Sequence, residues 1–334
     1  MSLHSGIMDI METQNHMSTK GEFGFIDYIK ELFPCPDGIY GIGDDCAILP
    51  SPEGEVLFST DLLMEGVHFL RSESSPEDVG WKAAAVNISD IAAMGGTPVA
   101  TFLSIALPKD AQGEWAERFM QGYSQISRIY NIPLLGGDTT SSLRDIAVNV
   151  GILGRCPKGR RLMRSSAKVG ETIYVTGPLG DSAGGLQAIL KNVERTEDVN
   201  VLIERHKRPV PRIREGQTLM ACGKVGAMMD ISDGIASDLR HIMKASGVGA
   251  TVYLDKLPAS PQLFEVCVKQ GWNMYELQTS GGEDFELLFT APEGLEKELD
   301  FKVYPVGKII SDNDLIWNVN GKPADFDFMG FKHF

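Results

Sequence analysis

Cysteine is scarce in this sequence, and its few copies form no recognisable framework. The five cysteines in 334 residues are scattered and include no CxxC pair. This disfavours a disulfide scaffold or a cysteine-based zinc site and is typical of reduced thiols. No uncharged apolar run is long enough to cross a bilayer, and residues 1–20 lack the apolar core of a signal peptide. We therefore expect a cytoplasmic protein with a disordered leader over residues 1–20.

Positive charge is also in short supply. Lysine and arginine number 31 against 45 aspartates and glutamates, which gives a net charge of -14 at pH 7. This balance argues against nucleic-acid and membrane partners, because both surfaces would repel the chain and no basic stripe neutralises phosphates. A polyphosphate ligand would therefore need metal ions as a bridge.

The glycine-rich signatures of the common nucleotide-binding folds are missing. The Gly-Lys dipeptides at 223–224 and 307–308 do not belong to a GxxxxGK[ST] loop, since the next residues are Val225 and Ile309. No strand is followed by GxGxxG, and there is no kinase catalytic loop or DFG motif. If ATP binds, acidic residues and metal ions must hold its phosphates.

What the chain does have is aspartate beside glycine or serine in several otherwise apolar segments. Hard oxygen ligands on tight turns are what Mg²⁺ needs when it also holds substrate phosphates. A single Asp-Gly pair usually just forms a turn, so only the joint occurrence of these segments indicates a metal site. The segments are 43–45, 59–61, 87–90, 136–138, 230–234 and 281–284.

Short apolar runs alternate with helical stretches, which predicts an α/β protein. The clearest helix begins after Ser75, an N-cap followed by proline and two acids, and ends at Gly95. Further helices are predicted over 110–130, 182–191, 211–222 and 233–246. Strands are predicted over 56–59, 99–107, 146–153, 172–176, 250–254, 285–290 and 302–306.

The length predicts two domains. We interpret the basic, glycine-containing stretch 155–160 as a hinge between them. The predicted division is an N-terminal α/β domain over 21–155 and a C-terminal α/β domain over 156–334.

Seven groups of motifs occur in order from about residue 21 to the C-terminus. They are GIGDDCA at 41–47, STD with EGVHF at 59–69, WKA with NISD at 81–90, GGDTT at 136–140, RHKRPVPR at 205–212, MDISDG at 229–234 and SGGEDFE at 280–286. Together they resemble the thiamine-monophosphate kinase family, within the superfamily of aminoimidazole ribonucleotide synthetase. The resemblance implies a two-domain α/β (α+β) fold of that type. Its N-terminal sheets pair across a homodimer, and its C-terminal domain is an α/β sandwich.

The resemblance also implies an activity and a set of site residues. The activity is phosphorylation of thiamine monophosphate to thiamine diphosphate by ATP, the last step of thiamine diphosphate biosynthesis, with several Mg²⁺ ions and with a K⁺ requirement left open. The implied metal ligands are Asp45, Ser59, Thr60, Asp61, Asp90, Asp138, Asp230 and Asp233. The implied ATP contacts are Gly137, Asp138, Arg164 and Ser232. The implied contacts to thiamine phosphate are His68, Glu283 and Phe328, the last at a position where the family usually has tryptophan, so that ring stacking is kept and the indole donor is lost.

The implied chemistry needs no catalytic side chain as general base. A phosphate monoester has its second ionisation near about pH 6, so its oxygen is already a nucleophile at neutral pH. Catalysis then consists of aligning two polyanions and neutralising their charge with carboxylate-bound divalent ions. Arg164 would add a planar fork to the ATP phosphates.

Several residues have structural alternatives that the sequence leaves open. His68 alone is more often a packed or surface histidine, and Glu283 fits the start of a strand equally well. Asp90 lies near the negative end of its helix, where a nearby cation would explain an acid. The arginines in 205–212 are interpreted as structural caps for carbonyl groups rather than as a phosphate patch. Residues 180–182 resemble an anion nest, although their aspartate is better explained as a helix cap.

Two other functions compete with the kinase. A different member of the superfamily would form a C–N bond or selenophosphate, but the chain has no reactive cysteine near a glycine-rich N-terminus and ends in phenylalanine rather than cysteine. A dimeric Mg²⁺- or Ca²⁺-binding regulator would not turn over, and EF-hand loops are absent. Metal-dependent production of ADP would separate the kinase from the regulator.

Overall fold

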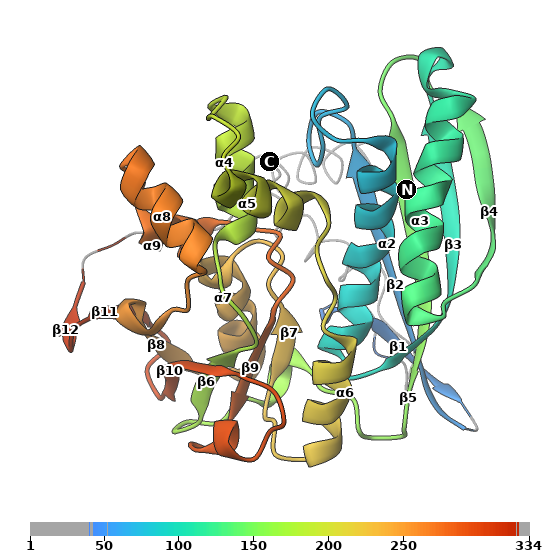
Figure 1. The fold of residues 1–334 in the computed structure, drawn as a ribbon. Helices are drawn as coiled ribbons and strands as arrows, with labels where there is room; N and C mark the ends of the chain where they lie inside the picture. The colour runs from blue at the N-terminus through green and yellow to red at the C-terminus, as the bar shows by residue number, and fades with distance from the viewer. Residues whose placement is uncertain (1–39, 41–42, 52, 325, 327–334) are drawn as a thin grey trace, which may run out of the picture.

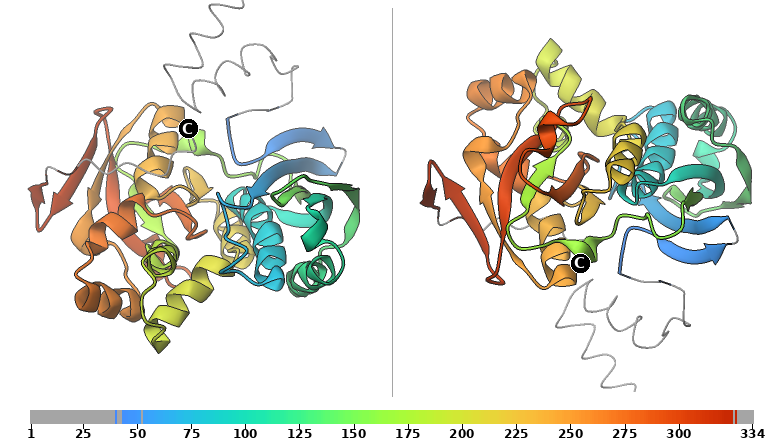
Figure 2. Two further views of the ribbon diagram at one scale, coloured as in Figure 1. Left: turned by 90° about the horizontal axis from the view of Figure 1, so that it is seen from above. Right: turned by 90° about the horizontal axis from the view of Figure 1, so that it is seen from below.

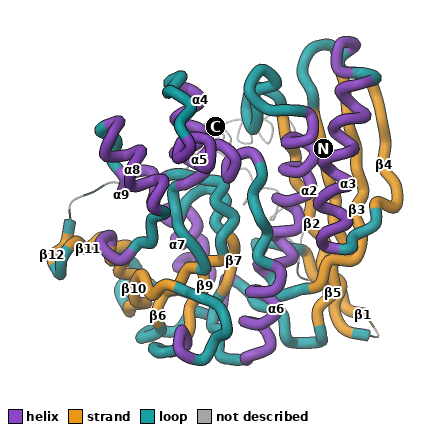
Figure 3. The backbone as a smooth tube through the Cα atoms, viewed as in Figure 1, coloured by secondary structure: helices purple, strands orange, loops and turns teal. Residues whose placement is uncertain are grey.

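The computed structural model describes residues 40, 43–51, 53–324 and 326, which form two α/β halves lying side by side (Figure 1). Each half is built on one sheet with helices packed against it (Figure 3). This confirms the predicted fold class. The predicted leader and Phe328 lie outside the described residues.

The first half contains a five-stranded sheet in the order β1-β2-β5-β3-β4, in which β3 and β4 are parallel and the other neighbours antiparallel. Helices α2 and α3 cover one face and enclose the apolar core of this half (Figure 2). The elements are β1 (Ala47–Ser51), β2 (Gly54–Met64), α2 (Pro76–Ala93), β3 (Thr97–Leu107), η1 (Lys109–Ala111), α3 (Glu114–Tyr130), β4 (Leu134–Ser141) and β5 (Ala147–Cys156).

Helix α2 begins where the sequence predicts. The Ser75 hydroxyl accepts a hydrogen bond from the Asp78 amide, and the Asp78 carboxylate accepts one from the Ser75 amide, both at 3.2 Å. Gly80 of α2 and Gly122 of α3 then allow the two helices to pack backbone to backbone. A Cβ atom at Gly80 would lie 2.0 Å from the Phe119 carbonyl oxygen, so α2 tolerates no larger residue at this position.

The second half contains a seven-stranded sheet in the order β12-β11-β8-β10-β6-β9-β7. Strands β8 and β11 are parallel, and the other neighbours are antiparallel. The strands are β6 (Thr172–Val175), β7 (Met228–Asp230), β8 (Gly249–Tyr253), β9 (Leu287–Ala291), β10 (Tyr304–Ile310), β11 (Leu315–Val319) and β12 (Lys322–Pro323). The helices are η2 (Arg164–Ser166), α4 (Asp181–Leu190), α5 (Glu197–Lys207), α6 (Ile213–Cys222), α7 (Ile235–Ser246), η3 (Leu254–Lys256), α8 (Pro261–Gln270), α9 (Met274–Ser280) and η4 (Leu295–Lys297).

The two halves share an apolar cluster, so they are not joined by the chain alone. Ala92 at the end of α2 packs in one cluster with Leu219 of α6 and Phe289 of β9. The connection over residues 205–212 also ties them together, because Arg208 forms an ion pair with Asp78 at 2.6 Å. The arginines of this connection are therefore structural, as predicted, although they pair with carboxylates rather than with carbonyl groups.

The segment 136–138, which taken alone suggested a turn, lies instead inside the edge strand β4. Gly137 has a φ of 151°, and a Cβ atom there would lie 1.7 Å from the Leu103 carbonyl oxygen on β3. The glycine therefore permits close approach of two parallel strands. The sequence also did not predict the strands β1, β7, β11 and β12, the helices α5, α8 and α9, or the short helices η2, η3 and η4.

The strand predicted from residue 285 begins later, at Leu287. Glu283 and Phe285 have φ values of 64° and 50°, which an extended strand does not allow. The carboxylate of Asp284 between them accepts hydrogen bonds from the amides of Gly180 and Ser182, at 2.7 and 3.2 Å. The anion at the start of α4 is therefore Asp284, and the predicted cap role of the aspartate in 180–182 is wrong.

Candidate functional site

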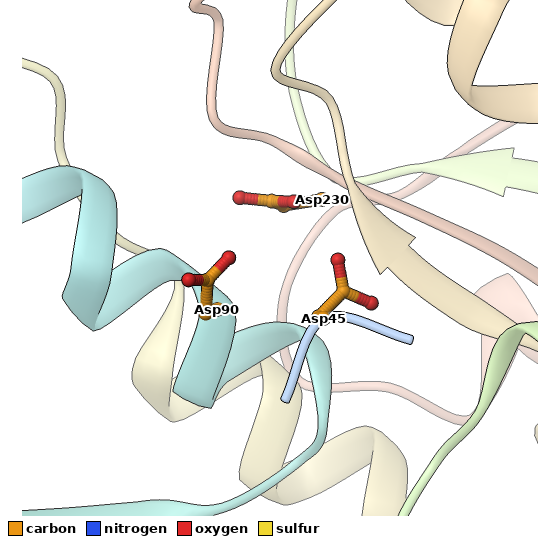
Figure 4. A group of neighbouring side chains, drawn as sticks. All are labelled: Asp45, Asp90 and Asp230. Carbon is orange, nitrogen blue, oxygen red and sulfur yellow. The ribbon is translucent and has the colours of Figure 1, made fainter. Parts of the chain in front are cut away.

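Three carboxylates from distant parts of the chain meet between the two halves (Figure 4). Asp45 precedes β1, Asp90 lies in the last turn of α2, and Asp230 ends β7. Ligand oxygens of the three lie within 4.8 Å of one another. The structure thus brings together three of the predicted metal ligands.

Neighbouring hydroxyl and amide groups orient these carboxylates. The Ser59 hydroxyl of β2 donates to Asp90, and the Ser89 hydroxyl donates to Asp230 at 2.5 Å. Asn87, one turn before Asp90, accepts a hydrogen bond from the Asp61 amide at 3.1 Å. Helix α2 therefore presents its polar residues to the cluster from one face, as the spacing predicts.

Burial and mutual repulsion make negative charge costly in this cluster. Burial and the nearby carboxylates, chiefly Asp61, raise the pKa of Asp90 well above its usual range. Burial and Asp45 raise the pKa of Asp230 to about 8 and that of Asp61 to about 6. A bound divalent cation would relieve both effects. Buried, closely spaced carboxylate oxygens with repelling charges fit Mg²⁺, which prefers hard oxygen ligands.

Arg164 of η2 forms an ion pair with one member of the cluster. Its Nη2 atom lies 2.7 Å from Asp45 Oδ1, and its backbone amide donates to Asp44 Oδ2 at 3.1 Å. Burial lowers the pKa of Arg164, but the Asp45 charge more than offsets this and raises it overall. The predicted ATP contact Arg164 therefore lies directly beside the predicted metal ligand Asp45. Asp44 accepts hydrogen bonds from the Arg164 amide and from the Asp45 amide in the turn.

A cavity of about 780 Å³ extends from the carboxylates into the second half. Asp61, Asp90, Asp230, Ser232 and Asp233 line one end, which contains both predicted metal ligands and a predicted ATP contact. The cavity also touches His68, Glu283 and the apolar side chains Phe69, Leu186 and Leu277. Its lining therefore combines an acidic end with a partly apolar one.

Two predicted substrate contacts, His68 and Glu283, lie at this second end. His68 Nδ1 accepts a hydrogen bond from the Met64 amide at 3.0 Å, which fixes the ring beside β2. Glu283 lies in a loop rather than at a strand start, and its amide donates to the Ser232 carbonyl at 2.7 Å. This bond connects the Glu283 loop to the segment that carries Asp233.

Three other predicted site residues do not join the cluster. The Thr60 hydroxyl accepts a hydrogen bond from Asn149 at 2.8 Å on the opposite face of the sheet, because side chains alternate along β2. Gly137 and Asp138 lie on the exposed edge strand β4, three strand positions from β2, or about 14 Å. The tertiary arrangement of this one chain separates them from the other ligands.

Sequence reasoning missed Lys82, His206 and Ser89. All three are buried, and Lys82 and His206 both contact Glu283. Lys82 stood within a quoted motif but received no role. A lysine inside an alanine-rich, otherwise apolar helix was the available signal, because a lysine is rarely buried without a partner.

Comparison with known proteins agrees with this architecture. Residues 43–156 match the family "AIR synthase related protein, N-terminal domain", and residues 168–315 match "AIR synthase related protein, C-terminal domain". The fold and its carboxylate cluster thus place the chain in the class of AIR synthase related proteins. A hydrogenase maturation protein, E. coli HypE, shares the fold at 18% identity with a TM-score of 0.67.

Within this class the similarity is much stronger to one group. The thiamine-monophosphate kinase of Salmonella typhimurium is 43% identical over 306 residues, which cover 88% of this chain and 91% of the relative. That of Aquifex aeolicus is 38% identical over 94% of this chain and 98% of the relative. The structure of AaThiL complexed with AMPPCP and TMP has a TM-score of 0.84 at 37% identity and covers 94% of this chain and 97% of its own. The chain belongs to the thiamine-monophosphate kinase family, which confirms the resemblance seen in the sequence.

Proposed function

We propose that the protein transfers the γ-phosphate of ATP to thiamine monophosphate, giving thiamine diphosphate and ADP. The observation that carries this proposal is a single cavity whose lining includes the closely spaced carboxylates of Asp90 and Asp230 as well as His68 and Glu283. Such a cavity can hold a nucleotide's phosphates and a phosphate-bearing acceptor end to end. The kinship with enzymes of this name supports the same reaction.

The residues of the acidic end would hold Mg²⁺. Asp45, Asp90 and Asp230 form the core of the ligand set, and Asp61 and Asp233 lie beside it along the cavity. Bound there, Mg²⁺ would neutralise phosphate charge and align the two reactants. Arg164 lies close enough to Asp45 to reach phosphates at the same place, and its two-pronged side chain suits a phosphoryl group.

The acceptor oxygen needs no base from the protein. A phosphate monoester is largely dianionic at neutral pH, so the chain's own residues have to position it and exclude water. Glu283 and His68 line the cavity where they would contact the thiamine portion of the acceptor. The apolar side chains Phe69, Leu186 and Leu277 can pack against its rings.

We also propose a homodimer that pairs through the open face of the first sheet. Phe58, Leu62 and Phe102 are 39%, 51% and 39% exposed on this face, and such a patch suits a partner surface. Asp138 lies on the same face, so pairing would change its surroundings. Light scattering should give the mass of two chains, and a monomer at working concentration would contradict the pairing.

The proposal also includes a cytoplasmic location, the predicted domain division and an open K⁺ requirement. The described cysteines, 46, 156, 222 and 267, are all free, which suits the cytoplasm. Among the described residues no helix is long and apolar enough to cross a membrane. The division between 21–155 and 156–334 is supported by the two separate sheets, although β5 extends to Cys156, and residues 1–20 lie outside the described residues. Whether K⁺ is needed is decided by assaying with K⁺ replaced by a larger cation.

The acceptor is tested directly. Purified protein with ATP and Mg²⁺ is given thiamine, thiamine monophosphate or an aminoimidazole-pathway substrate in parallel. Thiamine monophosphate should yield thiamine diphosphate and ADP in equal amounts, and a chelator should stop the reaction. Thiamine should be inert, because its alcohol would need a base. Turnover of thiamine, or ADP release without the diphosphate, would refute the proposed acceptor.

A further inference from the structure

Lys82 is buried at the junction of the two halves, although it lies on an alanine-rich helix. Its residue is 3% exposed. The ammonium group lies 2.7 and 2.8 Å from the two carboxylate oxygens of Glu283, and it donates to the His68 carbonyl oxygen at 3.3 Å. One side chain from α2 therefore contacts both residues placed at the second end of the cavity.

These contacts cross from one half of the molecule to the other. Lys82 and His68 belong to the first half, whereas Glu283 belongs to the loop before β9 in the second. The Glu283 backbone has a φ of 64°, so this loop does not hold the side chain by regular secondary structure. The position of the Glu283 carboxylate relative to β2 therefore depends on Lys82.

His206, which also contacts Glu283, does not supply the same positive charge. His206 Nδ1 lies 3.3 Å from Glu283 Oε2 and 3.0 Å from the Ser182 hydroxyl. Burial and the Lys82 charge lower the pKa of His206 to about 4, so this ring is neutral at physiological pH. Burial raises the pKa of Glu283, but the Lys82 charge is the chief cause that offsets this effect, and the pKa is lowered overall.

We propose that Lys82 is a positioning residue for substrate binding, which holds the Glu283 carboxylate ionised and aimed at the cationic heterocycle of the acceptor. This inference rests on the proposed function, because it takes thiamine monophosphate as the ligand. The thiazolium ring carries a permanent positive charge, and an ionised Glu283 carboxylate attracts it, whereas a protonated one would not. Lys82 acts through Glu283 and does not itself line the cavity.

A double-mutant cycle tests this role. Lys82→Met should raise the KM for thiamine monophosphate about tenfold or more, the loss expected for one hydrogen bond to a charged group. The KM for ATP should stay within about twofold, as for an unrelated site. Glu283→Gln should raise the same KM, and the double variant should be no worse than the weaker binder of the two single variants. Lys82→Arg should recover most of the affinity, since it keeps the charge.

Two further measurements separate this role from a purely structural one. Melting temperatures of all variants are measured, and Lys82→Gln replaces Lys82→Met in the cycle if the latter does not fold. Binding of thiamine monophosphate without ATP is measured by calorimetry, and Lys82→Met should weaken it by the same factor as KM. Unchanged binding with a lowered melting temperature, or fold-changes that multiply in the double variant, would overturn the proposal. Wild-type protein that does not turn over thiamine monophosphate would refute the proposed function instead.

Discussion

The two ends of the cavity shift the pKa values of their carboxyl groups in opposite directions. At the acidic end, Asp90 and Asp230 lie among other carboxylates, and their pKa values are raised by burial and repulsion. At the second end, Glu283 is half-buried, and Lys82 is the chief cause that lowers its pKa overall against the effect of burial. In the proposed function a cation from solution completes the acidic end, whereas the second end carries its own in Lys82. The proposed metal site therefore uses carboxylates whose charge the neighbouring residues leave largely uncompensated, whereas Glu283 already has a partner.

The largest effect is expected from neutralising a central carboxylate. Asp230→Asn keeps an oxygen that can accept from Ser89 but removes ligand charge, so turnover should fall by more than about a hundredfold. The melting temperature in chelator should not fall, because the raised pKa of Asp230, about 8, leaves the metal-free carboxyl mostly protonated at neutral pH. Steady-state kinetics and thermal unfolding check both results.

Asp312→Asn provides the matched control for that variant, because Asp312 is exposed and is not part of the cavity lining. It should leave turnover and melting temperature unchanged. Retained activity of Asp230→Asn at saturating Mg²⁺ would contradict the metal role of this cluster.

An intermediate effect is expected in the pH dependence of stability. Burial and Asp45 raise the folded pKa of Asp44 to about 7 and of Asp230 to about 8, above the unfolded value of 3.8. Their contribution to stability is therefore present at low pH and lost as pH rises through these values. In chelator, the melting temperature should fall by about 3 °C or more between about pH 6.5 and 8.5.

The titratable residues at the second end of the cavity should add nothing to the pH dependence of the melting temperature in that range. His206 has a pKa lowered to about 4, so it is neutral in the folded and unfolded states above about pH 6.5. Saturating Mg²⁺ should abolish this fall in melting temperature, since the bound cation replaces the protons of the carboxyl groups. A melting temperature that is flat across this range in chelator would show that the carboxylates are not crowded as the structure places them.

The smallest effect is expected at Thr60. Its hydroxyl is bonded to Asn149 on the open face of the sheet, so Thr60→Val should change Mg²⁺ affinity by no more than about twofold. Ser59→Ala, one residue earlier, should weaken it more, because the Ser59 hydroxyl contacts Asp90. Calorimetric titration with Mg²⁺ compares the two, and an equal loss in both variants would place the Thr60 side chain in the metal site.

Much of this architecture could be predicted from local sequence. The capping residues Ser75 and Asp78 defined the start of α2 correctly, and hydrophobic periodicity identified α3 and most of the long strands. Short elements such as β7 and β12 were missed because three or two residues carry no period. Strand β4 was missed because its two glycines and aspartate have the composition of a turn, and only pairing with β3 makes that segment extended.

The candidate site, too, was determined partly by the sequence and partly by the tertiary structure. By itself the sequence determined the ligand chemistry, since acids on turns, an excess of negative charge and no Walker loop left metal-held phosphates as the remaining option. Only the tertiary structure decided which acids meet, because Asp45, Asp90 and Asp230 come from separate elements, while Asp138 lies strands away. It alone also decided that Lys82 faces Glu283, 201 positions later. The physical reason is that residue type fixes what a group can bind, whereas burial and neighbouring charges, which depend on the packing of distant segments, fix its charge state and its partners.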